Sequence, residues 1–134
     1  MKRENLMLVI ASLLSILFLT LHLTSDVIRA RAGTAEAGGS TIVGLPVLVV
    51  WLYGTLMLAE RRSGHIIMLV GSVIAMGIPV IHTLGPAGFF TGQMARVPPA
   101  FLFVWVLHAL GVTGMFSLIL SVQGLWGLRR VQPR

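Results

Sequence analysis

Charged residues occupy so few positions in this chain that they divide it into four long uncharged runs. Only 14 of the 134 residues are Asp, Glu, Lys or Arg, whereas a soluble domain carries about 25% charged residues over its surface. The uncharged runs cover residues 5–25, 37–59, 63–95 and 97–128. A helix needs roughly 20 consecutive apolar residues to cross a bilayer. Each run is therefore long enough for one membrane-spanning helix, and none is comfortably long enough for two.

This pattern predicts an all-α fold: a polytopic integral membrane protein built as a four-transmembrane-helix bundle. We expect one membrane domain over residues 1–134, with spans at about 6–24, 42–59, 65–84 and 99–128. The predicted connections are outer loops at 25–41 and 85–98 and one short inner loop at 60–64. A soluble enzyme and a disordered tail are excluded by the apolar runs, and a disulfide scaffold is excluded because the chain has no Cys.

Positive charges flank the spans unevenly, and this asymmetry predicts the orientation. Cytoplasmic segments of membrane proteins carry an excess of Lys and Arg. With both termini inside, the inner segments hold seven basic residues, which are Lys2, Arg3, Arg61, Arg62, Arg129, Arg130 and Arg134. The outer loops then hold three, which are Arg29, Arg31 and Arg96. We therefore expect both termini in the cytoplasm. Because nine of the ten basic residues are Arg, a bias of GC-rich bacterial coding, we expect a bacterial cytoplasmic membrane.

The placement of charge argues against several functions. The net charge of +6 does not indicate a nucleic-acid partner, because the cations lie at span ends, where they meet lipid headgroups. No acidic or basic residue falls at mid-bilayer depth in the predicted spans, and ion-coupled transporters usually need one there. The sequence has no nucleophile motif, no phosphate-binding Gly loop and no paired carboxylates. We therefore expect the protein not to be an enzyme.

Small residues recur at helical spacing in the last two spans. The predicted helix-packing seam consists of Gly71 and Ala75 in the third span, and Gly114, Ser117, Ser121 and Gly124 in the last. Membrane helices associate through small residues and interhelical hydrogen bonds. The leading functional hypothesis is therefore a small non-enzymatic membrane protein that acts through helix packing, homo-oligomerisation or association with a partner membrane subunit.

Three histidines fall at one depth on three different spans. His22 and His82 lie near the outer ends of the first and third spans, and His108 lies at the outer boundary of the last. Asp26 follows His22 by four residues, so both share one helical face if the helix continues that far. Imidazole and carboxylate groups suit zinc or copper. Haem b is a variant of this site, in which His22 or His82 and the facing His108 would be the two axial ligands. The alternatives are an outer-facing metal or haem site, or histidines that only stabilise helices at the interface.

Trp51 lies near the centre of the second span, away from the interfaces where Trp is enriched. A buried Trp N–H needs a hydrogen-bond partner, for which we expect a Ser or a carbonyl group of the third or fourth span. Core packing is one interpretation, and a lipid or small apolar ligand in contact with Trp51 and Tyr53 is the other. A third functional hypothesis is an uncoupled pore or facilitator for a neutral or apolar solute.

Overall fold

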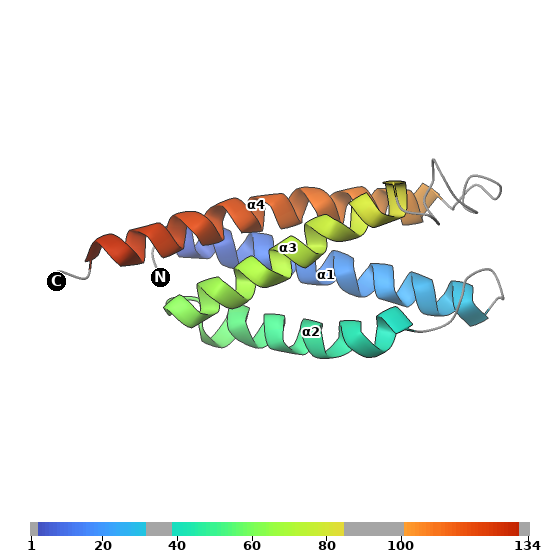
Figure 1. Ribbon diagram of the computed structural model, residues 1–134, viewed down its shortest axis with the longest axis horizontal. Helices are drawn as coiled ribbons and strands as arrows, with labels where there is room; N and C mark the ends of the chain where they lie inside the picture. The colour runs from blue at the N-terminus through green and yellow to red at the C-terminus, as the bar shows by residue number, and fades with distance from the viewer. Residues whose placement is uncertain (1–2, 32–38, 85–100, 132–134) are drawn as a thin grey trace.

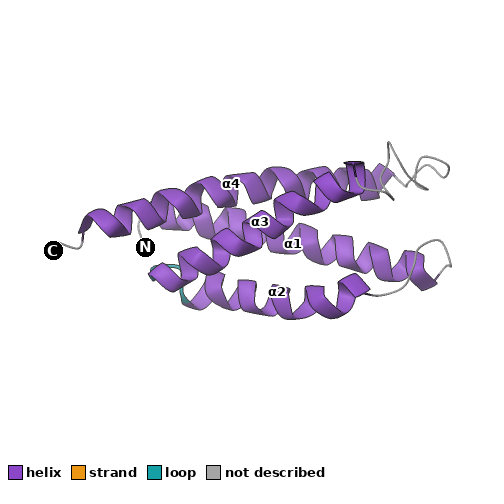
Figure 2. Ribbon diagram, in the orientation of Figure 1, coloured by secondary structure: helices purple, strands orange, loops and turns teal. Residues whose placement is uncertain are grey.

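Each uncharged run forms one helix. The computed structural model of the protein describes residues 3–31, 39–84 and 101–131. Its four helices are α1 (Arg3–Arg31), α2 (Gly39–Met57), α3 (Arg62–Leu84) and α4 (Phe101–Val131). Among the described residues there is no strand (Figure 2). The all-α prediction, with one helix for each run, is therefore confirmed.

The helices form a bundle in which α2 lies to one side. Helix α4 packs against both α1 and α3, whereas α2 contacts α1 and α3 but makes no contact with α4 within the described residues. Helix α3 starts beside α2 and diverges from it, so that its far end lies against α4 (Figure 1). The start of α1, the end of α4 and the α2–α3 connection all lie at the same end of the bundle (Figure 1).

Three helices are long and apolar enough to cross a membrane. These segments are Arg3–Ile28 in α1, Arg62–Leu84 in α3 and Phe101–Leu128 in α4. Helix α2 contributes a shorter apolar segment, Val43–Met57. The outside of the bundle is rich in exposed apolar side chains, which all four helices supply. Its interior holds several fully buried hydroxyl groups, so polarity is arranged in the opposite sense to that of a soluble protein.

Several helix ends differ from the predictions. Helix α1 continues to Arg31 and α2 already begins at Gly39, so the predicted loop at 25–41 is wrong at both of its ends. Charged residues mark the edge of an apolar layer but do not break a helix, and the Ser25 hydroxyl even donates to the Leu21 carbonyl at 2.9 Å. Helix α2 ends two residues before the predicted 59. The predicted loop at 85–98 lies outside the described residues, as do the first two residues of the span predicted at 99–128.

The α2–α3 connection is a tight turn that depends on a glycine. The Arg61 N–H donates to the Leu58 carbonyl at 2.9 Å, and the His65 N–H donates to the Arg61 carbonyl at 3.2 Å. A Cβ atom on Gly64 would collide with the carbonyl of Leu58. Because only glycine lacks this atom, α3 can begin directly against the end of α2.

Gly114, Ser117 and Gly124 of the predicted seam pack against α3 within this chain, whereas Gly71 of α3 packs against Trp51 of α2. A Cβ atom on Gly114 would lie 2.9 Å from the Cβ of Ala75. Beside this contact, Ser72 Oγ hydrogen-bonds to Ser117 Oγ at 2.8 Å, and both side chains are fully buried. Ser121 is also fully buried, and its hydroxyl has no hydrogen-bond partner among the described residues. The seam therefore serves internal packing.

At the inner end of the seam, Gly124 of α4 lies against the ring of His65 of α3. A Cβ atom on Gly124 would collide with the ring of His65, which is buried near the start of α3. The Nδ1 of His65 lies 3.1 Å from the carbonyl oxygen of Arg61, one turn earlier. Gly124 therefore provides the space that this ring needs between α3 and α4.

Trp51 joins three helices at the centre of the core. Its ring is 1% exposed and lies directly against Gly71 of α3, where a Cβ atom would collide with it. The Trp51 N–H donates to Ser12 Oγ of α1 at 2.8 Å. The Thr55 hydroxyl donates to the Trp51 carbonyl at 2.8 Å, so Ser12 donates its own proton to Thr55 Oγ1 at 2.7 Å. The prediction that the Trp51 N–H has its hydrogen-bond partner in the third or fourth span is wrong, because the N–H points to Ser12 of α1.

Candidate metal centre

His22 and Asp26 face the same side of α1, because four residues make slightly more than one helical turn. The continuation of α1 to Arg31 preserves this spacing. His22 Nε2 lies 3.4 Å from Asp26 Oδ2, and the two side chains are 3% and 22% exposed. An imidazole nitrogen and a carboxylate oxygen therefore lie side by side at a position that is largely shielded from solvent.

His82 reaches the same place from α3. Its Nδ1 lies 2.9 Å from the carbonyl oxygen of Ile78. A carbonyl oxygen can only accept, so Nδ1 carries the proton and Nε2 of the neutral ring keeps its lone pair. Histidines that bind metals usually donate their second N–H to a carbonyl or carboxylate in this way. This contact engages Nδ1 and leaves Nε2 of His82 as the nitrogen available to a metal ion.

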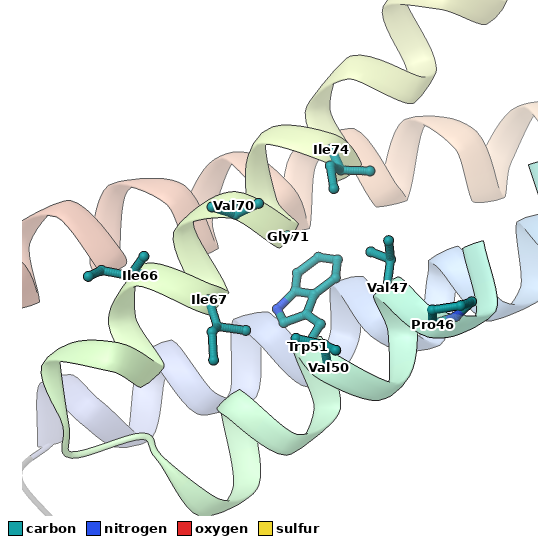
Figure 3. Close-up of a pocket in the computed structure, with 9 residues that line it drawn as sticks. All are labelled: Pro46, Val47, Val50, Trp51, Ile66, Ile67, Val70, Gly71 and Ile74. Carbon is teal, nitrogen blue, oxygen red and sulfur yellow. The ribbon is translucent and has the colours of Figure 1, made fainter. Parts of the chain in front are cut away.

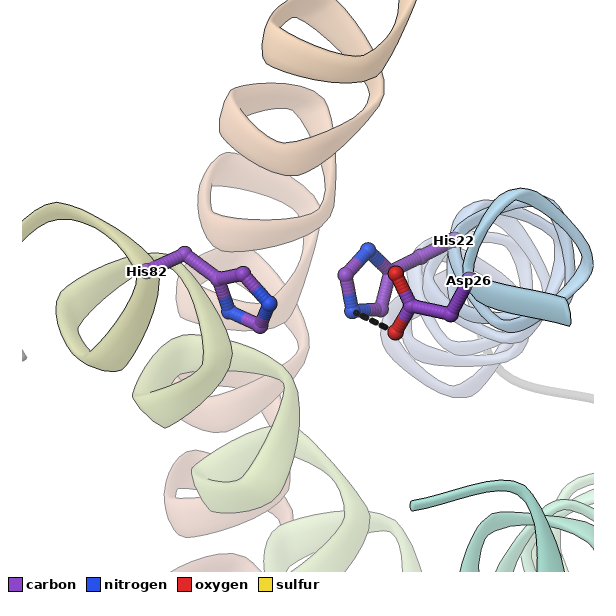
Figure 4. Close-up of side chains that lie close together, drawn as sticks. All are labelled: His22, Asp26 and His82. Carbon is purple, nitrogen blue, oxygen red and sulfur yellow. Dashed lines mark ion pairs between the residues drawn. The ribbon is translucent and has the colours of Figure 1, made fainter. Parts of the chain in front are cut away.

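The two helices bring these three residues together. One ligand atom from each of His22, Asp26 and His82 lies within 4.8 Å of the others. The two imidazole rings meet edge to face, with centroids 4.9 Å apart. Figure 4 shows the rings directed toward each other from α1 and α3, with the Asp26 carboxylate beside His22. In the described part of the chain, this is the group of His and acidic residues that is compact enough for a metal ion. We call it the His–Asp cluster.

The separations in the His–Asp cluster suit a small ion. Ligands bound at 2.0–2.1 Å in a tetrahedral site lie about 3.3 Å from one another, and the His22–Asp26 separation is 3.4 Å. The cluster as a whole, which lies within 4.8 Å, must contract by about 1–1.5 Å, a movement that side-chain rotation can supply. Three protein ligands would leave one tetrahedral position for water or another ligand.

Phe103 of α4 covers the cluster on a third side. Its ring centroid lies 5.5 Å from that of His22 and 6.0 Å from that of His82, and the side chain is buried. The sequence reasoning missed this residue. The signal was present, because Phe103, Leu107 and Leu110 continue the seam outward from Gly114 at spacings of four, three and four. All three are buried.

His108 does not belong to the cluster, and its inclusion in the predicted constellation is wrong. The side chain is exposed, and its Nδ1 lies 2.8 Å from the carbonyl oxygen of Val104 in its own helix. The cause is the phase of α4: the helix turns Phe103 and Leu107 toward the bundle, so the residue after Leu107 points elsewhere. The haem variant of the site therefore loses its support, since it needed His108 opposite His22 or His82. His22 and His82 cannot replace that pair, because their rings lie in contact and leave no gap for a porphyrin.

Trp51 and Tyr53 do not share a ligand site. Tyr53 is 57% exposed, and it lies on a different face of α2 from the buried Trp51. The apolar groove beside Trp51 is lined by other residues of α2 and by α3. The pairing of these two aromatic residues around one ligand is therefore wrong, because two positions along a helix differ in direction by about 200°.

Comparison of the chain with protein-family models, curated proteins and solved structures gave no match. Its function is therefore inferred from the chemistry of its own residues.

Proposed function

We propose that the chain is an integral membrane protein of the bacterial cytoplasmic membrane and that all four helices span the bilayer. Three helices satisfy the length and apolarity that a span needs. Helix α2 has 19 residues and is therefore about 28 Å long, close to the roughly 30 Å of the hydrocarbon layer. The exposed apolar exterior and the buried hydroxyl groups support the same placement, because lipid is the solvent that such a surface prefers.

Both termini are proposed to be cytoplasmic. The end of the bundle where α1 begins and α4 ends also carries the α2–α3 connection (Figure 1), and the segments at this end hold seven of the ten basic residues. The chain has no Cys, so single Cys variants report the topology directly. In intact cells, an impermeant maleimide should label Arg96→Cys and leave Lys2→Cys unlabelled until the membrane is opened. The reverse labelling would contradict the orientation.

We infer that the His–Asp cluster is the functional site and that it binds one divalent zinc or copper ion, without catalysis. The observation that carries this proposal is the convergence of His22, Asp26 and His82 from two helices to within 4.8 Å. Two neutral imidazoles and one carboxylate are ligands that zinc and copper share, whereas magnesium and calcium prefer oxygen alone. The buried Phe103 ring beside them lowers the local polarity, and this strengthens the attraction between the ion and Asp26.

Two other hypotheses from the sequence find less support. The seam residues are occupied by contacts within one chain, so association with a second copy or a partner subunit would have to use another surface. A pore would need a wettable path, and the centre around Trp51 is a buried apolar cluster that includes Leu8, Met68 and Ala75. Metal binding is therefore the function that the geometry supports best.

The proposal is tested by the effect of metal on stability. A ligand that binds the folded state at 100 times its dissociation constant raises the free energy of unfolding by about 2.7 kcal/mol. Zinc or copper should therefore raise the thermal midpoint of the detergent-purified protein, and the increase should vanish in His82→Ala. His108→Ala is the matched control and should keep the full increase. An equal response of His82→Ala and the parent protein would exclude the His–Asp cluster as the site.

A further inference from the structure

An apolar groove opens between α2 and α3 on the side of Trp51 that faces away from α1. Its volume is about 350 Å³. One wall is formed by Val47 and Val50 of α2, the other by Ile66, Val70 and Ile74 of α3, and the Trp51 ring lies between them (Figure 3). The groove exists because α3 diverges from α2 along its length (Figure 1). It lies well away from the His–Asp cluster, since His82 follows Ile74 by eight positions along α3.

The α3 wall of the groove ends in a positive charge. Ile66, Val70 and Ile74 follow one another at intervals of four residues and so form one stripe along the helix. Arg62 stands four residues before Ile66, which places it on the same face one turn closer to the start of α3. Arg62 is exposed. Together with Glu60 and Arg61, it gives this end of the groove a net charge of +1.

We propose that this groove binds one phospholipid with an anionic headgroup, its acyl chain along the Ile66–Val70–Ile74 stripe and its phosphate at Arg62. The inference rests on the proposed membrane placement and is independent of metal binding. The stripe from Ile66 to Ile74 covers eight residue steps, or about 12 Å. This length fits within one leaflet, about half of the roughly 30 Å hydrocarbon layer. In the proposed orientation it is the cytoplasmic leaflet, where anionic lipids attract Arg and Lys.

The shape of the groove favours an acyl chain over a helix of a second copy. An α-helix with its side chains is about 10–12 Å wide, and a groove of about 350 Å³ lined by large aliphatic side chains is too small to admit one. A single hydrocarbon chain needs neither that width nor a polar partner. The Trp51 ring lies at the floor of the groove, almost fully covered by its neighbours. It is held there by the hydrogen bond from its N–H to Ser12 and by its contact with Gly71.

Quenching of Trp51 fluorescence by brominated lipid tests the proposal. In a Trp105→Phe/Trp126→Phe protein, Trp51 is the remaining Trp, and both replaced residues are more than half exposed. This protein is placed in phosphatidylcholine nanodiscs that contain a minor fraction of phosphatidylglycerol, with the bromine on the acyl chains of one lipid at a time. When the brominated lipid makes up the same mole fraction of both samples, brominated phosphatidylglycerol should quench Trp51 more strongly than brominated phosphatidylcholine. Equal quenching by the two lipids would overturn the proposal.

Matched variants separate the groove from general lipid contact. Val70 lines the groove and Val73 does not, although both are about half exposed on α3 (53% and 55%). Val70→Phe should fill the groove and reduce quenching, and Val73→Phe should leave it unchanged; the same result for both would exclude the groove. Arg62→Gln should lower the preference for phosphatidylglycerol about five-fold, the effect of one Arg at an anionic surface, while Arg61→Gln should keep most of it.

Two further outcomes would also count against the proposal, in distinguishable ways. If the protein dimerises in nanodiscs and neither lipid quenches Trp51, a second copy covers the groove. In the parent protein, the exposed Trp105 and Trp126 should be quenched by any brominated lipid. If they are not quenched, the membrane placement itself fails, and the lipid site fails with it.

Discussion

Gly71→Ala is the substitution that most sharply tests how the core is built. A Cβ atom at position 71 would collide with ring carbons Cδ2, Cε2 and Cε3 of Trp51. All three belong to a rigid ring whose N–H is held by Ser12 on the opposite side. The ring cannot move away from α3 without breaking that hydrogen bond, so one added methyl group affects three helices together.

The expected loss follows from two terms. Overpacking by a methylene-sized group costs about 1–3 kcal/mol, and an interhelical hydrogen bond within a membrane contributes about 0.6 and at most about 1.7 kcal/mol. We therefore expect Gly71→Ala to lower the free energy of unfolding by about 2–4 kcal/mol, measured by circular dichroism during denaturation in mixed SDS and dodecylmaltoside micelles.

Gly77→Ala is the matched control, because it lies in the same helix and nothing is within 4 Å of its added Cβ. It should be neutral or stabilise the protein by up to about 1 kcal/mol, since Ala favours helix over Gly. In a Trp51→Ala background the ring is gone, and Gly71→Ala should then behave like the control. Equal stability of the two single variants in the parent background would refute the account of the core.

Other contacts of the seam give predictions of the same kind. Ser72→Ala removes the buried hydrogen bond to α4 and should lower the free energy of unfolding by about 1 kcal/mol. Ser121→Ala removes a buried hydroxyl without a described partner and should not destabilise the protein; a larger loss than in Ser72→Ala would contradict this. Gly124→Leu should displace the His65 ring and destabilise the bundle. Gly127→Leu should not, because its added Cβ meets nothing within 4 Å.

Much of the fold was predictable because the positions of charged residues and the lengths of apolar runs can be read directly along the sequence. The 14 charged residues separate four runs, and each run became one helix. Small residues at spacings of three and four predicted packing seams without naming their partners, and Gly114 and Ala75 join α3 to α4 at these seams. The ends of α1 and α2 were less predictable, because a helix does not have to stop where the apolar layer stops. Nothing in residues 25–31 forces the backbone to turn.

The candidate site was predictable in part. Their distances from the outer ends of the predicted spans placed His22, Asp26 and His82 in one layer, and the structure places them within reach of one ion. Depth does not determine direction, and His108 occupies the right layer but faces outward. The direction of these side chains follows from the face of α4 on which the seam lies, because this face turns Phe103 toward the bundle and His108 away from it. The direction of the Trp51 N–H, toward Ser12, depends on a side-chain rotation that periodicity does not encode.

Binding of one metal ion by His22, Asp26 and His82 is measured as the metal that the chain retains after equilibrium dialysis. The metal-stripped protein in detergent is dialysed against limiting zinc, and separately against copper, and the metal retained per chain is determined by atomic emission. The parent protein and His108→Ala should each retain one ion per chain, and His22→Ala and His82→Ala should retain almost none. Acidification should release the ion, because protons compete for the imidazole lone pairs. Retention of no metal by the parent protein, or equal retention by all the variants, would contradict the account.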